Sequence, residues 1–208
     1  MTGKFITLEG GEGAGKSTQL RLLGEALGQH GCDLVETREP GGTPGAEDIR
    51  ALIVTGAADR WDGLTEMLLV NAARADHVTR LIQPALARGA WVICDRFVDS
   101  TFAYQGAGKG MARSLLIDQH RLATGNLWPD LTIVLDLPPE IGSARAAERR
   151  GEADRFERHD AAFHDRVAAA FRDIARADPE RVRLVDARPD PVTVAAAIWA
   201  EVAPLLAA

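Results

Sequence analysis

Eight consecutive residues near the N-terminus have the types and spacing of a phosphate-binding loop. Residues 10–17 read G-G-E-G-A-G-K-S, which fits the P-loop pattern G-x-x-x-x-G-K-[ST]. Glycines let backbone N–H groups converge on phosphate oxygens with no Cβ in the way. Lys16 is long enough to reach the β- and γ-phosphates, and the Ser17 hydroxyl suits Mg²⁺. We therefore predict an ATP-binding loop made of Gly10, Gly11, Glu12, Gly13, Ala14, Gly15, Lys16, Ser17 and Thr18.

The segments on either side of the loop support this interpretation. Residues 5–8 are a short β-prone run that ends where the motif begins, and residues 18–27 carry apolar side chains at helical spacing. The N-terminal end of such a helix is positive and would face the same phosphates. A dinucleotide-binding loop is excluded, because its third glycine would fall where Lys16 stands.

A second pair of charged residues follows a later apolar run. Asp95 and Arg96 come directly after residues 91–94, which read W-V-I-C. A carboxylate at the end of a strand beside a P-loop suits Mg²⁺ or its water shell, and Arg96 would neutralise phosphate oxygens. Spacing alone leaves one alternative open, a structural ion pair between these two neighbours.

The rest of the chain must position these groups, and it alternates between strand and helix patterns. Besides the run before the P-loop, we predict strands at 33–38, 91–94, 131–137 and 182–185. Helical spacing, in addition to the helix after the loop, predicts helices over 46–54, 64–87, 111–124, 163–174 and 194–205. One more helix is expected to open at Pro138 and Pro139, because proline is tolerated at the first helical position. Five strands with intervening helices indicate an α/β fold, a parallel sheet with helices on both faces. We expect residues 1–208 to form one domain.

Composition excludes several classes of protein. The 208 residues are 46% hydrophobic with a net charge of −6, whereas a general nucleic-acid binder would usually be basic. No apolar stretch approaches the roughly 18 residues of a membrane helix. Cys32 and Cys94 form no C-x-x-C pair, and the five histidines lack metal-ligand spacing. With no secretory signal at the N-terminus, we expect a cytoplasmic protein without nucleic-acid or membrane partners.

Several stretches beyond the P-loop are typical of one enzyme family. Residues 37–43 read T-R-E-P-G-G-T, residues 71–74 read N-A-A-R, and residues 95–106 read D-R-F-V-D-S-T-F-A-Y-Q-G. With P-D-L-T at 129–132, they resemble bacterial thymidylate kinase over essentially the whole chain. The stretch at 95–106 is far more specific than the P-loop.

The resemblance implies a P-loop kinase fold with a five-stranded sheet, a homodimer, and Mg²⁺-dependent transfer of the γ-phosphoryl group of ATP to dTMP. It implies that Arg38 and Arg96 hold the acceptor phosphate and that Arg74 contacts the thymine edge. Many relatives have a cis peptide bond at the position of Glu39–Pro40.

The resemblance also implies residues around the sugar and base. Glu12 would approach the 3′-hydroxyl or the metal region, and Tyr104 would lie under the sugar. Ser100 and Thr101 would line the base pocket, with Gln105 close by.

Val70 departs from the family pattern. It lies four residues before Arg74, so the two share a helix face. Many relatives have a phenylalanine at this position that stacks on thymine, which valine cannot do. We expect the base to pack against a smaller wall, or another aromatic residue such as Phe102 to contribute.

Five arginines gather around Gly151, with acidic residues among them. One interpretation is a solvated helix end of mixed charge. The other is a lid over ATP, at about residues 145–158, because Gly13 occupies a loop position where some family members have an arginine. Family members without that P-loop arginine resemble the type of enzyme in which the lid supplies the catalytic arginines. The arginines are Arg145, Arg149, Arg150, Arg155 and Arg158.

Lys16, Arg96 and one lid arginine form the expected catalytic set. Arg150 aligns best with the lid arginine, and Arg149 is one residue away. The alternatives within enzymes are other P-loop kinases for small molecules or nucleoside monophosphates. A nucleotide-dependent switch is disfavoured because N-K-x-D and D-x-x-G are absent. An ATP-dependent nucleic-acid enzyme is disfavoured by charge and size.

Overall fold

The computed structural model describes residues 3–147, 155–156 and 158–206. Its described strands form one sheet in the order β2-β3-β1-β4-β5, and every pair is parallel. The α/β prediction is confirmed, and the strands differ from the predicted ones by one or two residues at their ends. They are β1 (Phe5–Gly10), β2 (Leu34–Arg38), β3 (Trp91–Asp95), β4 (Leu131–Asp136) and β5 (Val182–Asp186).

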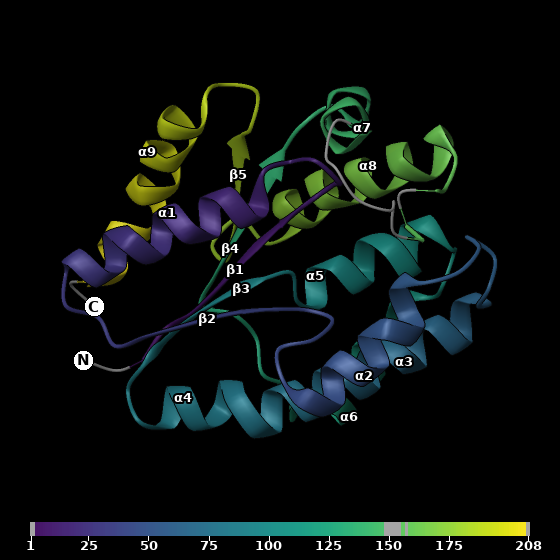
Figure 1. Cartoon of the computed structure of the whole chain (residues 1–208), viewed down its shortest axis with the longest axis horizontal. Helices are drawn as coiled ribbons and strands as arrows, with labels where there is room; N and C mark the ends of the chain where they lie inside the picture. The colour runs from purple at the N-terminus through teal and green to yellow at the C-terminus, as the bar shows by residue number, and fades with distance from the viewer. Residues whose placement is uncertain (1–2, 148–154, 157, 207–208) are drawn as a thin grey trace.

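Helices cover both faces of the sheet (Figure 1). The predicted helix over 64–87 is helical throughout, but its middle widens into a π-helical turn, η1 (Val78–Ile82). The predicted helix at 111–124 begins two residues later. The α-helices are α1 (Lys16–Gln29), α2 (Pro44–Val54), α3 (Gly63–His77), α4 (Gln83–Ala87), α5 (Val98–Thr101), α6 (Arg113–Thr124), α7 (Pro139–Ala147), α8 (Ala161–Ala177) and α9 (Pro191–Val202), and a 3₁₀ turn, η3 (Ala203–Leu206), follows α9.

The three central strands, β1, β3 and β4, are buried on both faces, to which successive side chains point alternately. In β1, Ile6 and Leu8 belong to the core under α1 and α9. Phe5, on the other face, packs with residues of α3, η1 and α4. This double burial explains why the central strands read as nearly continuous apolar runs, whereas the edge strands β2 and β5 carry charged residues and are partly exposed.

One helical segment was missed by the sequence analysis. After β3 the chain forms α5 and then a π-helical stretch, η2 (Phe102–Gly108). A π turn adds a residue per turn, so apolar side chains do not recur at the usual spacing. The segment carries Ser100, Thr101, Tyr104 and Gln105, so it decides how the second half of the site is built.

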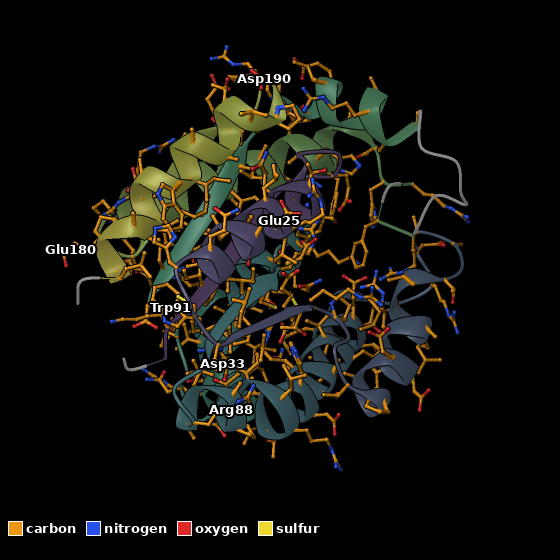
Figure 2. All side chains as sticks on the ribbon, turned by 60° about the vertical axis from the view of Figure 1, so that its left-hand side comes forward. Glu25, Asp33, Arg88, Trp91, Glu180 and Asp190 are labelled. Atoms are coloured by element: carbon orange, nitrogen blue, oxygen red, sulfur yellow. The ribbon has the colours of Figure 1, made fainter. Side chains whose placement is uncertain are left out.

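Functional side chains gather at the carboxyl ends of the strands. Arg38 ends β2 and is paired in register with Asp95, which ends β3 next to Leu8 of β1. At the opposite edge, Asp33 and Arg88 form an exposed ion pair of 3.3 Å beside Trp91 (Figure 2). Ligands of open parallel sheets bind at the carboxyl edge.

Among the described residues, no helix combines the length and apolar character that crossing a membrane requires.

Candidate active site

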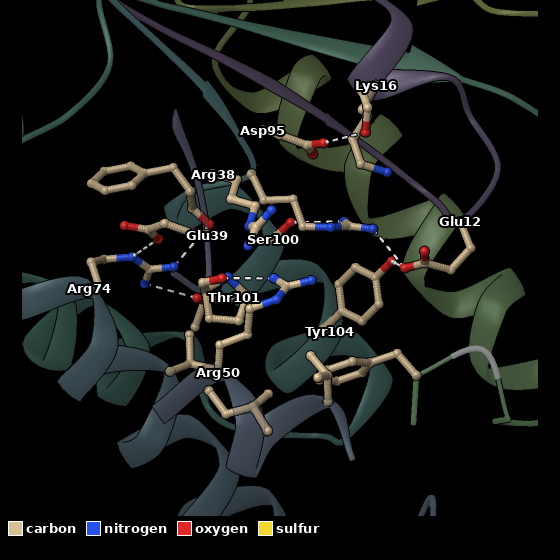
Figure 3. A pocket seen from close by; sticks show the side chains of 18 of the residues that line it. Glu12, Lys16, Arg38, Glu39, Arg50, Arg74, Asp95, Ser100, Thr101 and Tyr104 are labelled. Carbon is tan, nitrogen blue, oxygen red and sulfur yellow. Dashed lines mark hydrogen bonds and ion pairs between the residues drawn. The ribbon is translucent and has the colours of Figure 1, made fainter. Parts of the chain in front are cut away.

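A cavity of about 480 Å³ opens at the carboxyl edge of the sheet. It joins the P-loop to the ends of β2 and β3, to α2 and α3, and to the α5–η2 segment (Figure 3). Gly10, Gly11 and Ala14 form the rest of the loop. Most residues expected from the sequence line the cavity: Glu12, Gly13, Gly15, Lys16, Ser17, Thr18, Arg38, Val70, Arg74, Asp95, Arg96, Ser100, Thr101, Tyr104 and Gln105.

Lys16 folds back over its own loop. Its Nζ donates to the carbonyl oxygens of Gly11 at 2.8 Å and Gly10 at 3.3 Å. Burial, followed by the nearby Arg96 charge, lowers the pKa of Lys16. Gly13 and Gly15 have φ angles of 66° and 92°, a region that side chains disfavour. The loop is therefore a turn that holds a cation at the entrance to α1.

Ser17 and Asp95 provide two oxygen atoms at one point of the cavity. The Ser17 hydroxyl donates to Asp95 Oδ2 at 3.1 Å. Hard oxygen ligands of this kind fit Mg²⁺, which usually takes one or two protein ligands and completes its shell with phosphate and water. Within the described residues, no group of three or more His, Cys, Asp or Glu side chains could hold a metal alone.

Arg96 does not pair with its neighbour Asp95, so the structural ion pair that spacing left open is wrong. Its guanidinium binds Glu12 Oε1 at 2.6 Å, the Gly10 carbonyl oxygen at 2.9 Å and Ser100 Oγ at 3.2 Å. Its backbone φ is 71°. A non-glycine residue in that region costs on the order of 1–3 kcal/mol, so tertiary contacts must hold it there.

Glu9 supplies those contacts, although the sequence analysis did not single it out. Its carboxylate is buried and accepts from the Phe97 N–H at 2.7 Å and from the Ser100 hydroxyl at 2.5 Å. Burial, with a further contribution from Asp99, raises the pKa of Glu9 to about 7. Glu9 thus ties the end of β1 to the turn that presents Arg96. The sequence signal that could have identified Glu9 is an acidic residue inside an otherwise apolar strand.

Tyr104 stands between the P-loop and the rest of the cavity. Its hydroxyl donates to Glu12 Oε1 at 2.9 Å, and the Arg96 guanidinium lies 5.0 Å from its ring centre. Phe156 meets the same ring edge-on, with centroids 5.6 Å apart. Phe156 also lines the cavity and was not anticipated.

Arg74 is almost completely buried, and a carboxylate compensates its charge. Its Nε donates to Glu39 Oε2 at 2.7 Å, and its terminal nitrogens donate to Thr101 Oγ1 at 3.0 Å and to the Phe97 carbonyl oxygen at 3.1 Å (Figure 3). The other Glu39 oxygen lies 3.0 Å from His77 Nδ1. The Glu39–Pro40 peptide bond is cis, as the resemblance implies.

Val70 lines the cavity on the same face of α3 as Arg74. Phe102 does not take over the missing aromatic contact. It stacks on Trp128 at 6.2 Å and lines a separate cavity with it. The aromatic residues that line the main cavity, in the described part of the chain, are Phe97, Tyr104 and Phe156.

Three further arginines of the described chain line the cavity. Arg38 is bound by both oxygens of Glu47 at 3.0 Å and remains half exposed. Arg50 enters from α2 and Arg145 from α7 (Figure 3 for Arg50). Arg50 was missed because one arginine on an amphipathic helix carries no distinctive signal.

The expected lid is only partly described. Arg149 and Arg150 lie outside the described residues. Arg155 is fully buried and binds Glu66, so the solvated-face interpretation is wrong for this arginine. Arg158 is exposed and donates to the Gly56 carbonyl oxygen at 3.2 Å.

Fold and site together define an α/β protein of the P-loop class, with the five-stranded parallel sheet of a nucleoside monophosphate kinase. The sequence profile of thymidylate kinase matches residues 8–198, and the chain belongs to that family. A thymidylate kinase of Rhizorhabdus wittichii is 51% identical over 99% of this chain and 100% of its own length. One of Caulobacter vibrioides is 55% identical over 94% of each chain. The crystal structure of thymidylate kinase from Ehrlichia chaffeensis superposes with a TM-score of 0.78, is 33% identical, and is matched over 97% of this chain and 99% of that one.

Proposed function

We propose that this protein transfers the γ-phosphoryl group of ATP to dTMP, forming ADP and dTDP for the synthesis of dTTP. The observation that carries the proposal is the single cavity that joins the P-loop to the α5–η2 segment. One half holds a phosphate-binding loop with Lys16, and the other holds the residues that the family uses for a deoxynucleotide. A binding switch would not need an acceptor site of this size.

In the proposed mechanism, an oxygen of the acceptor phosphate attacks in line. This oxygen is already ionised at neutral pH, so no strong general base is needed. Phosphoryl transfer mainly requires positioning and charge stabilisation. Lys16 and Arg96 would offset the developing charge, together with a lid arginine, Arg150 or its neighbour Arg149.

Ser17 and Asp95 would hold Mg²⁺ directly or through its water. When bound, the ion would neutralise charge on the β- and γ-phosphates of ATP.

The acceptor would lie along α3 and the α5–η2 segment. We assign Arg38 and Arg96 to its phosphate. We assign Tyr104, with its partner Glu12, to the sugar. The base would lie among Val70, Arg74, Ser100, Thr101 and Gln105.

We also propose a homodimer. Two adjacent helices, α3 and α6, carry half-exposed or exposed leucines at spacings that place each pair on one helix face. They are Leu64 at 52%, Leu68 at 48%, Leu115 at 37% and Leu122 at 80% exposure. Apolar side chains that gather in this way are typical of an interface. We infer that the dimer acts in the cytoplasm, where both free cysteines would stay reduced.

A panel of nucleoside monophosphates tests the activity. ADP formation is measured with ATP and Mg²⁺ in the presence of dTMP, dUMP, dCMP, dGMP or AMP. We expect dTMP to give the highest kcat/KM. Turnover without any acceptor would indicate a nucleotide switch, and a preference for another monophosphate would indicate a different kinase of the same fold.

A further inference from the structure

A buried carboxylate outside the catalytic group, Glu66 of α3, has three polar partners. Its Oε1 accepts from Gln105 Nε2 at 2.8 Å, and its Oε2 accepts from Lys109 Nζ at 2.8 Å. Arg155 NH2 donates to the same Oε2. The Glu66 side chain has no exposed surface. Two cations therefore compensate one carboxylate, whose other oxygen is used to hold an amide.

This contact decides which way the Gln105 amide faces. A glutamine side chain ends in a donor NH₂ and an acceptor carbonyl, and its hydrogen-bond partners decide which of the two faces which way. An ionised carboxylate only accepts, so the amide atom 2.8 Å from Glu66 must be the NH₂ group. Gln105 also lines the main cavity, and its Oε1 is the amide atom left for a ligand.

The opposite polarity is fixed at Arg74, which lines the same cavity. A guanidinium can only donate, and Glu39 anchors this one through Nε at 2.7 Å. The pocket therefore offers a ligand a donor from Arg74 and an acceptor from Gln105. The 4-oxo edge of thymine or uracil presents an acceptor at O4 and a donor at N3–H. Cytosine presents a donor at N4 and an acceptor at N3, which is the reverse.

We propose that Glu66 is the positioning residue that makes the base pocket selective for 4-oxo pyrimidines over 4-amino pyrimidines, by holding the Gln105 amide in one orientation. The inference rests on the proposed kinase function and deepens it. Lys109 and Arg155 compensate the carboxylate charge, whereas only the contact between Glu66 and Gln105 carries the selectivity. If Glu66 is replaced by a group that can also donate, the amide becomes free to turn over.

The test compares kcat/KM for dTMP, dUMP and dCMP in the full-length wild type and in Glu66→Gln. We expect the dTMP-to-dCMP ratio to fall by about 10- to 100-fold, the range of one lost pair of base-reading hydrogen bonds. The dTMP-to-dUMP ratio should stay constant, because both bases present the same edge. The matched control is Lys109→Met, which removes a partner of Glu66 but leaves the amide contact, and should keep both ratios.

Glu66→Gln leaves two buried cations without their carboxylate, which could prevent folding. The double variant Glu66→Gln with Lys109→Met restores the net charge of the cluster and then carries the test. An unchanged dTMP-to-dCMP ratio in a folded Glu66 variant, or an equal change in Lys109→Met, overturns the inference. A wild type inactive on dTMP would instead refute the proposed function.

Discussion

At the scale of single residues, Lys16 shows how the P-loop backbone holds a positively charged group in the cavity. Its ammonium group is held by two loop carbonyls and is largely removed from water. Replacing it by alanine removes a preorganised donor, so we expect Lys16→Ala to lose about 2–4 kcal/mol of transition-state stabilisation, a loss of about 30- to 1,000-fold in kcat. Steady-state kinetics with dTMP and ATP measures this. Lys4→Ala, before β1 at the other edge of the sheet, is the control, and near-normal turnover of Lys16→Ala would refute the P-loop assignment.

The ring of Tyr104 is expected to exclude ribonucleotides, because a bulky group under the sugar leaves no room for a 2′-hydroxyl. Its hydroxyl is already used by Glu12, so ring and hydroxyl can be tested separately. We expect Tyr104→Phe to keep the wild-type preference for dTMP over its ribose analogue, measured as kcat/KM, and Tyr104→Ala to lose most of it. If Tyr104→Ala keeps the ratio while losing activity on both substrates, Tyr104 is only a packing residue.

Glu9 is expected to make the folded state less stable as the pH rises from 4.5 to about 7. Burial raises its pKa from an ordinary 4.5 to about 7, so the folded protein holds this proton more tightly than the unfolded chain. Its contribution to stability is therefore greatest below pH 4.5 and is lost as the pH rises to about 7. Relative to Glu9→Gln, the wild type should lose up to ~3 kcal/mol of unfolding free energy across this window. Urea titrations at several pH values measure it, and a constant difference between the two proteins would contradict the assignment.

At the scale of elements, the P-loop and α7 touch through their backbones. A Cβ on Gly142 would lie 2.3 Å from the Glu12 carbonyl oxygen, and one on Gly13 would lie 2.1 Å from the Gly142 carbonyl oxygen. This contact gives a physical reason for glycine at position 13, where some relatives have arginine: a side chain there would have to displace α7.

Gly142→Ala should therefore push the P-loop out of place. Forcing a methyl group into a packed contact costs typically 1–3 kcal/mol, so we expect KM for ATP to rise about tenfold while the fold persists. The control is Gly28→Ala in α1, where an added Cβ meets no atom within 4 Å and helix propensity favours alanine. An unchanged KM for ATP in Gly142→Ala would show that α7 yields without affecting the loop.

The elements that could be predicted from sequence are those in which one local signal decides the structure. The central strands bury both faces, so their apolar runs are nearly continuous, and the P-loop follows β1 as its motif requires. The α5–η2 segment could not be placed because its π turn breaks the helical period. Asp95 and Arg96 illustrate the same limit at the site, because adjacency in sequence does not reveal which partner each side chain binds.

Residues that act through distant partners were missed for a related reason. Glu66 and Arg155 are 89 positions apart, and Glu9 lies 88 positions from the Phe97 N–H that it binds. Neither contact leaves a trace in local spacing. The family resemblance identified many of the residues that line the cavity, but only the folded chain shows what holds them.

At the scale of the whole molecule, the exposed leucines of α3 would connect the proposed dimer to the acceptor half of the cavity. Leu68 is 48% exposed, and two residues further along the same helix Val70 lines the cavity. A partner that covers Leu64 and Leu68 would hold α3 against the core and so fix the wall of the base pocket. Assembly and acceptor binding should therefore change together.

Leu68→Asp tests this link. A charge at a half-exposed position costs the isolated subunit little, but it is expensive inside an apolar interface. We expect light scattering to show a dimer for the wild type and a monomer for the variant, and KM for dTMP to rise more than KM for ATP, since α3 lines only the acceptor half. Leu184→Asp on the edge strand β5, where the leucine is 43% exposed, is the matched control and should remain dimeric. A Leu68→Asp protein that stays dimeric would place the interface elsewhere. A monomer with unchanged KM for dTMP would show that the dimer does not support the pocket.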